Sequence, residues 1–406
     1  MNTPMRSRVA ALAALAALAL GGCSTTIDGR AVSAPAPPGT DDVDVAVLDT
    51  GNYPTTARPA LGDAGNPIEG GLVESRRMAT SVLGPWEADP SLLVYDQLAT
   101  GVVKGPKTVN FFLGSPIGDG LADHNFVAGF SSARHTSTGS YLGAVNVVLR
   151  LASAGDAAAA AAAMAASAVS LTFAFADKPV TTQPFSIPRH PETAAVTYRS
   201  HDPRSGAERF SVTAITAHGP YVLCQAADSA ESAQRAAQLI ATTLELQQPL
   251  IDKFSPTPVD QLAQLPLDPT GLLAHTLPPA KDNTTVEDGI YDQLGIRHFQ
   301  GDPVRAQALF KSVGLQQGSY TAAARVYQTA DAGAAGRIVA ELADQAAATL
   351  KPAAGVAGMP KARCFKSTLG YWCVASAARY AFEVQSPHEA DAAQMVAAQY
   401  RILTGK

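Results

Sequence analysis

Residues 143–165 read GAVNVVLRLASAGDAAAAAAAMA, and residues 321–343 read TAAARVYQTADAGAAGRIVAELA. Each stretch contains a short run rich in strand-forming residues, and each then passes, at Ser153 or Asp331, into a run rich in alanine, the strongest helix former. Because the two stretches match in this order, we interpret them as the same strand-and-helix pair in two copies of one unit.

Two further landmarks recur on either side of this pair. Asp-Pro at 89–90 and at 302–303 is typical of a helix start, with Asp as the cap and Pro in the first turn. Strands beginning at Tyr221 and Tyr380 each lead into a closing helix. Each unit then reads helix, strand, helix, strand, strand, strand, helix. The alternative to a duplication is that two alanine-rich segments align by chance. The pattern predicts an α+β fold with two tandem related domains, each a mainly antiparallel sheet with helices packed on one face.

Composition narrows the class of protein. The chain has 406 residues, of which 47% are hydrophobic and 16% charged, enough apolar material for two or three domain cores. Its formal net charge of −5 argues against a basic nucleic-acid binder, so we expect no nucleic-acid partner.

The N-terminus has the pattern of a bacterial lipoprotein signal peptide. Residues 1–22 carry two arginines before an apolar run of about a dozen residues, too short to span a membrane. The run ends in Leu-Gly-Gly followed by Cys23, as a lipobox does, and we expect Cys23 to become the acylated N-terminus. The alternative is an ordinary secretory signal. The prediction is therefore an exported protein on the outer face of the cytoplasmic membrane, anchored by lipid on Cys23.

Two stretches without periodicity divide the remaining chain. Residues 23–44 are rich in Pro, Ser and acidic residues and predict a flexible tether, and residues 255–288 carry repeated prolines and predict a linker. The first α+β domain is then expected at 45–254 and the second at 289–406.

The cysteines have separate predicted roles. Cys364 and Cys373 flank FKSTLGYW, two strand-like arms around a turn, which in an exported protein favours a disulfide over a metal site. Closing a loop of about ten residues would stabilise the fold by about 2–3 kcal/mol. Cys224 lies among apolar residues on a predicted strand, so we expect a buried, unreactive thiol rather than a nucleophile.

No stretch of the sequence carries a complete catalytic motif. Val-Leu-Asp-Thr-Gly around Asp49 resembles the loop of an aspartic protease, but no second Asp-Thr-Gly supplies the partner carboxylate unless a homodimer does. Signatures of phosphate loops, nucleophile elbows and metal-binding helices are missing as well. We therefore predict no catalytic residues, no metal and no cofactor.

One stretch, residues 295–305, is a candidate binding surface. It gathers Arg297, His298 and Arg305 around the predicted start of a helix, and such a start with arginines beside it can bind an anion. The alternative is a plain strand-to-helix connection.

Several segments together resemble a known family. LDTGNYPTTARPALG (48–62), VESRRMA (73–79), LGPWEADPSL (83–92) and GIRHFQGDPVRAQALF (295–310) are similar to a family of actinomycete cell-envelope lipoproteins, a domain of unknown function with an N-terminal and a C-terminal part. The resemblance implies lipid anchoring and no assigned catalytic residues. In architecture alone, the chain also resembles the extracellular sensor domains of actinomycete serine/threonine kinases.

The function we expect is a non-enzymatic binding or structural component of the envelope. Duplicated units commonly place a ligand site where they meet, so a cleft between the domains is the first candidate site for a small molecule or lipid. An envelope protein is the other kind of partner. The alternatives are an envelope-polymer hydrolase that uses Asp49 and an accessory protein of a membrane transporter or kinase.

Overall fold

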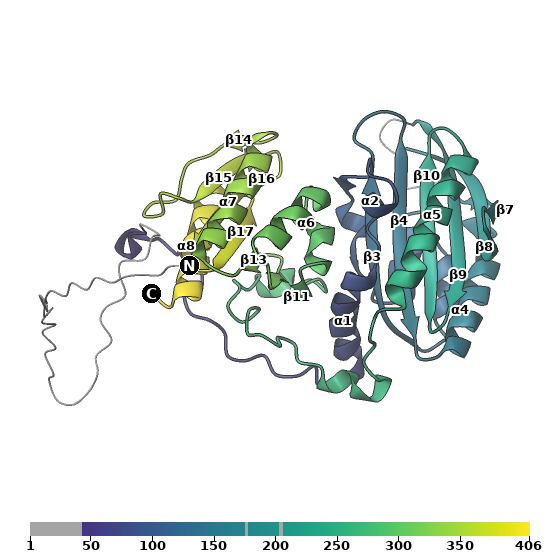
Figure 1. The fold of residues 1–406 in the computed structure, drawn as a ribbon, viewed down its shortest axis with the longest axis horizontal. Coiled ribbons are helices and arrows are strands. Elements are labelled where there is room, and N and C mark those ends of the chain that lie inside the picture. Colours follow the sequence, from purple (N-terminus) through teal and green to yellow (C-terminus); the bar gives the residue numbers. More distant parts are fainter. Residues whose placement is uncertain (1–42, 175–177, 203–205) are drawn as a thin grey trace, which may run out of the picture. The chain divides into compact units, whose positions relative to one another are not determined.

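The computed structural model of the protein describes residues 43–174, 178–202 and 206–406. The predicted signal peptide, Cys23 and all of the predicted tether except its last two residues lie outside this part of the chain. The described chain contains two large antiparallel sheets, one in each predicted domain (Figure 1). They confirm an α+β fold with two tandem sheet domains.

The sheet of the first domain has strand order β1-β3-β4-β10-β9-β8-β7, with β2 paired to β3. Its strands are β1 (Val94–Tyr95), β2 (Gly101–Val102), β3 (Phe126–His135), β4 (Leu142–Leu151), β7 (Gln183–Ile187), β8 (His190–His201), β9 (Glu208–His218) and β10 (Tyr221–Ser229). A separate pair is formed by β5 (Ser170–Leu171) and β6 (Val180–Thr181). The helices are α1 (Pro67–Met78), α2 (Pro85–Ala88), α3 (Pro106–Leu113), α4 (Ala154–Ser167) and α5 (Ala233–Ile251).

The sheet of the second domain has strand order β11-β12-β13-β17-β16-β15-β14. Its strands are β11 (Gly289–Asp292), β12 (Gln317–Tyr320), β13 (Ala324–Gln328), β14 (Lys351–Pro352), β15 (Arg363–Ser367), β16 (Gly370–Ala377) and β17 (Tyr380–Ser386). The helices are α6 (Pro303–Ser312), α7 (Ala332–Ala347) and α8 (Glu389–Thr404). Short 3-10 helices along the chain are η1 (Val45–Val47), η2 (Ala79–Ser81), η3 (Gln97–Ala99), η4 (Ile117–Leu121), η5 (Val259–Gln264), η6 (Lys281–Asn283) and η7 (Gly295–Phe299).

The two sheets share one connectivity. The strands β3-β4-β10-β9-β8 of the first domain occupy the same order as β12-β13-β17-β16-β15 of the second. In both domains one helix (α4 or α7) follows the second of these strands (β4 or β13), and another (α5 or α8) follows the strand that comes last in the sequence (β10 or β17). The unit is therefore strand, strand, helix, three strands, helix. The sequence pattern predicted only one strand before the first helix, where the structure has two (β3 and β4, or β12 and β13).

The matched landmarks at the centre of each unit are helix caps. The side chain of Ser153 accepts a hydrogen bond from Asp156 N at the start of α4, and Asp331 accepts one from Ala334 N at the start of α7. Each cap supplies a partner to an amide that the first turn of a helix leaves unpaired. The predicted equivalence of these two positions is thereby confirmed.

The prediction that helices cover one face of each sheet is wrong, because both faces are covered. In β10, Tyr221 and Leu223 belong to one core with α5, whereas Val222 and Cys224 belong to another with α4. In the second domain, α7 and α8 likewise belong to different cores. The reason lies in the central strands, which are apolar at successive positions rather than at alternate ones.

The first of the two Asp-Pro landmarks is also a wrong prediction. Asp302 caps α6 as expected, through Val304 N and Arg305 N. Asp89 instead ends α2, accepts hydrogen bonds from Ser91 and pairs with an arginine of α5. No α-helix follows Asp89 in the described chain until α3, because the carboxylate closes a local turn rather than capping a helix.

Residues 43–58 pack on the second domain, although the prediction assigned the part from residue 45 onward to the first. Leu48 is buried in the core around α8, and the Tyr53 hydroxyl donates to Asp391 Oδ1 at 2.8 Å. Asp44 N donates to the carbonyl of Gly358 at 2.9 Å. These residues therefore precede the first domain in the sequence but belong to the second domain in the structure.

The proline-rich stretch 255–288 is packed along the protein. Thr257 N donates to Glu74 Oε1 at 2.8 Å in the first domain, and Leu277 is fully buried in the second. A Cβ on Gly70 of α1 would lie 2.1 Å from the carbonyl oxygen of Leu262, so this close approach requires glycine. The stretch joins the domains and also contacts both.

One hydrophobic core runs through both domains. It contains Leu223 and Leu239 from the first domain and Phe310 and Ile338 from the second. Each domain also has a core of its own. The described part of the chain consequently forms one compact unit.

Candidate functional site

Arg134 on β3 holds the two domains together. Its Nη2 donates to the carbonyl oxygens of His298 and Gln300 of the second domain, both at 2.8 Å, and its Nη1 donates to Leu93 O at 2.9 Å. The residue is 1% exposed, and burial lowers the pKa of its guanidinium to about 10, so it stays charged at neutral pH. A charged donor to several carbonyls is among the stronger hydrogen-bonding arrangements in proteins.

His298, predicted as a binding residue, belongs to the same interface. Its Nε2 donates to Ala79 O at 3.0 Å, so its Nδ1 accepts from the Ser132 hydroxyl at 2.8 Å. Burial, followed by the charge of Arg297, lowers the pKa of His298 to about 3. The imidazole is therefore neutral, enclosed and fully paired, and it does not face a ligand.

The two arginines predicted with His298 point elsewhere. Arg297 is buried, donates to Gln307 Oε1 at 2.5 Å and pairs with Glu87 across the interface at 3.3 Å. Arg305 forms a surface ion pair with Glu341 at 2.5 Å. The anion-binding surface expected from the sequence is therefore a wrong prediction. The stretch 295–305 mainly forms the contact between the domains, because its apolar and hydrogen-bonding groups pack and pair there.

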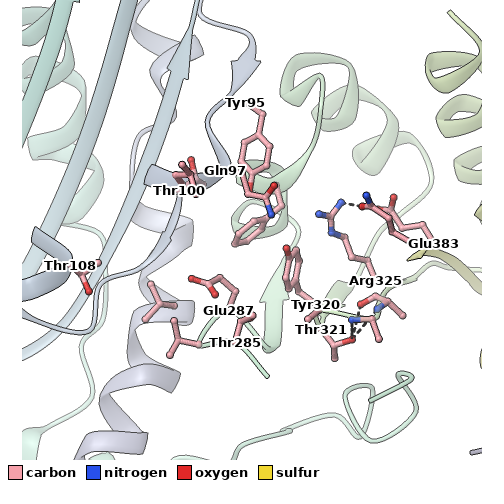
Figure 2. Close-up of a pocket in the computed structure, with 18 of the residues that line it drawn as sticks. Tyr95, Gln97, Thr100, Thr108, Thr285, Glu287, Tyr320, Thr321, Arg325 and Glu383 are labelled. Atoms are coloured by element: carbon pink, nitrogen blue, oxygen red, sulfur yellow. Dashed lines mark hydrogen bonds and ion pairs between the residues drawn. The ribbon is translucent and has the colours of Figure 1, made fainter. Parts of the chain in front are cut away.

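Beside this interface lies a pocket of about 690 Å³, within the range of small-molecule sites. Figure 2 shows Tyr95 and Gln97 of the first domain on one side, with Tyr320 and Arg325 of the second on the other. The first domain supplies Tyr95, Gln97, Leu98, Thr100, Val102, Lys104, Lys107, Thr108, Phe111 and Phe112. The linker and the second domain supply Thr285, Val286, Glu287, Phe299, Tyr320, Thr321, Ala322, Ala323, Ala324, Arg325, Trp372, Glu383, Val384 and Gln385.

Glu383 on β17 organises the wall from the second domain. Its Oε1 accepts from the Tyr327 hydroxyl at 2.6 Å and from Arg325 Nη1 at 3.3 Å, and its Oε2 accepts from Trp372 Nε1 at 2.5 Å. The strand register places Arg325 directly opposite Glu383. The Arg325 guanidinium lies over the ring of Tyr320, 4.7 Å from its centroid. Glu383 is 6% exposed and has three donors, so it positions its neighbours.

The wall from the first domain comes from β1, from α3 and from the segment between them. Lys104 and Lys107 are exposed, and Leu98 and Phe111 are exposed apolar side chains, at 63% and 40%. Gly101, at φ +145°, lies against Glu287, since a Cβ there would be 2.6 Å from Glu287 Oε1. The backbone at the start of β2 thus needs glycine to come close to the linker.

A chain of buried contacts joins the two walls. Gln300 Nε2 donates to the Tyr327 hydroxyl at 2.9 Å, and Gln300 O accepts from Arg134. The guanidinium of Arg134 lies 4.9 Å from the centroid of the Tyr95 ring. The path runs from Glu383 on one wall to Tyr95 on the other, so the pocket is built before any ligand arrives.

The other residues singled out from sequence lie outside this pocket. Asp49 accepts hydrogen bonds from Gln394 Nε2 and Gly51 N, which lower its pKa and make it a turn residue that contacts α8. Cys364 and Cys373 are opposite each other in β15 and β16 and form the predicted disulfide. Cys224 is fully buried, and burial raises the pKa of its thiol, as expected of an inert cysteine.

The described residues contain no group of three or more His, Cys, Asp or Glu side chains placed to hold a metal ion. In the same residues, no helix has both the length and the apolar content to cross a bilayer.

The sequence pattern did not predict that Arg325, Glu383 and Trp372 contact one another. Arg325 lies within one of the two stretches that revealed the duplication, and Trp372 precedes a disulfide cysteine. A charged residue on an otherwise apolar strand is a signal that could have been read at Arg325 and Glu383. Their pairing, however, depends on strand register.

Comparison with known proteins identifies related sequences without naming an activity. The family model described as "Domain of unknown function (DUF7373) N-terminal" matches residues 61–267, and "Domain of unknown function (DUF7373) C-terminal" matches residues 272–406. No curated protein matches the chain. Among solved structures, the extracellular domain of PknH from Mycobacterium tuberculosis is 14% identical, with 43% of this chain and 96% of that chain covered, at a TM-score of 0.30.

Proposed function

The chain belongs to the DUF7373 family, whose description assigns no function, and we propose that it is an exported, lipid-anchored envelope protein that binds a small molecule between its two domains without transforming it. The observation that carries the binding role is the pocket of about 690 Å³ with walls from both domains. The N-terminal sequence pattern and Cys23 support the anchoring.

The character of the pocket supports binding over catalysis. Glu383 is occupied by Tyr327, Arg325 and Trp372, so it is not placed as a free acid or base. Asp49, the residue on which the hydrolase alternative rests, is not part of the pocket lining. The remaining groups can contact a ligand by stacking, hydrogen bonding and charge.

Native mass spectrometry of the full chain, purified from its own membrane fraction, tests the proposal. We expect a mass that includes acyl chains on Cys23 and a noncovalent ligand. Ala322 is exposed and lines the pocket, so Ala322→Trp should fill the space and remove the ligand mass. Ala330→Trp is the matched control, because Ala330 is exposed outside the pocket lining.

Either of two results would contradict the binding role: no ligand on the wild-type chain, or equal ligand on the Ala322→Trp and Ala330→Trp chains. An unmodified Cys23 would contradict the lipid anchor independently of the pocket.

A further inference from the structure

The side chains that line the pocket indicate one class of ligand, an inference that rests on the function proposed above. We propose that the ligand is an anionic saccharide, a sugar that carries a carboxylate or a phosphate group. Three features of the pocket support this ligand: the arginine on one wall, the lysines on the other, and the neutral polar groups and aromatic side chains on both.

Arg325 is preorganised for an anion. Glu383 engages its Nη1, and the ring of Tyr320 lies against its guanidinium plane. Within the described residues, Nε and Nη2 of Arg325 have no hydrogen-bond acceptor, and the side chain is 26% exposed beside the pocket. A planar guanidinium with an open pair of N–H groups fits the paired oxygens of a carboxylate or phosphate.

The opposite wall adds positive charge. Lys104 and Lys107 are exposed, line the pocket and form no ion pair within the part of the chain described. With Arg325 they make three cations against the two carboxylates of Glu287 and Glu383. The charged side chains that line the pocket therefore sum to a net charge of +1, which favours an anionic ligand.

Neutral groups on the walls favour a sugar over other anions. The amides of Gln97 and Gln385 and the hydroxyl of Thr108 can both donate and accept, as sugar hydroxyls do. Trp372 supplies a ring surface, against which the C–H face of a sugar can pack. A fatty acid would leave the amides desolvated without partners, and a bare inorganic anion would leave most of the pocket unfilled.

Isothermal titration calorimetry of the full chain tests this with two matched pairs of disaccharides. The first pair is N-acetylglucosaminyl-N-acetylmuramic acid, which has a carboxylate, against N,N′-diacetylchitobiose, which has none. The second is lactose 1-phosphate against lactose. We expect the charged member of one pair to bind at least about tenfold more tightly than its neutral partner, a difference of about 1.4 kcal/mol, and the pair that responds identifies the anion.

Variants locate the effect. Arg325→Lys keeps the charge but loses the planar pair of donors, and the Lys104→Gln/Lys107→Gln double variant changes only exposed side chains, so it should fold even if the first does not. Each should weaken the charged disaccharide several-fold and leave the neutral one unchanged. Lys311→Gln, an exposed lysine outside the pocket lining, should have no effect.

Equal binding of charged and neutral partners, or no binding of either pair, would overturn the assignment of an anionic saccharide. If a ligand mass that Ala322→Trp removes is nevertheless present, the binding function stands and only the ligand class fails. If no such mass exists, both proposals fail together.

Discussion

His298 illustrates how a residue that suggests a ligand contact in the sequence becomes a buried structural group. Nε2 donates to Ala79 O and Nδ1 accepts from Ser132, which leaves the ring no position for a ligand. Residues 298 and 132 are far apart in the chain, so no local pattern reports their contact. The buried Cys224 was predictable because its apolar neighbours are adjacent in sequence.

The lowered pKa of His298 gives stability a pH dependence. Between the ordinary value of 6.5 and the folded value of about 3, the unfolded chain binds a proton that the folded protein does not. The contribution of His298 to the free energy of unfolding is therefore fully present above pH 6.5, and it decreases as the pH falls from 6.5 toward 3. We expect this residue to contribute about 2 kcal/mol less at pH 5 than at pH 7.5.

Urea denaturation of the wild type and His298→Gln at both pH values measures this contribution. The stability difference between the two proteins should shrink by that amount at pH 5, since the other titrating groups are common to both. A difference that stays constant with pH would show that His298 is not held neutral.

At the scale of elements, local chemistry was a good guide to helix starts and hairpins. The strands at Tyr221 and Tyr380 begin where predicted, and Cys364 and Cys373 lie opposite each other in a hairpin. Asp89 was misread because an Asp-Pro pair can close a turn as well as cap a helix. Which of the two forms depends on tertiary contacts, here the ion pair with Arg235.

The equivalent caps of α4 and α7 make a prediction about both copies of the unit. Ser153→Ala and Asp331→Ala each remove the acceptor for an amide of the first turn. Each should lower the free energy of unfolding by about 1 kcal/mol, measured by chemical denaturation. Asp331→Asn retains an acceptor and is the control; a loss equal to that of Asp331→Ala would mean that the cap is not what stabilises the helix.

At the scale of the whole molecule, the shared core and Arg134 couple the two domains. Arg134→Met leaves the carbonyls of His298 and Gln300 without their donor inside the interface. We expect a loss of about 3 kcal/mol and, in differential scanning calorimetry, separation of one unfolding transition into two.

Arg305→Met is the matched control for that variant, since Arg305 makes only an exposed ion pair. It should change stability by no more than about 0.5 kcal/mol. A single cooperative transition in the Arg134→Met protein would show that the shared hydrophobic core alone couples the domains.

The sequence by itself determined the α+β class, the duplication, the disulfide and the inert cysteine, because capping, β-hairpin spacing and apolar neighbours act over a few residues. Only the tertiary structure decided that helices cover both faces of each sheet, that residues 43–58 pack on the second domain, and that Arg325 and Glu383 meet beside a pocket. These outcomes depend on strand register and on contacts between residues far apart in the chain, which local sequence patterns do not encode.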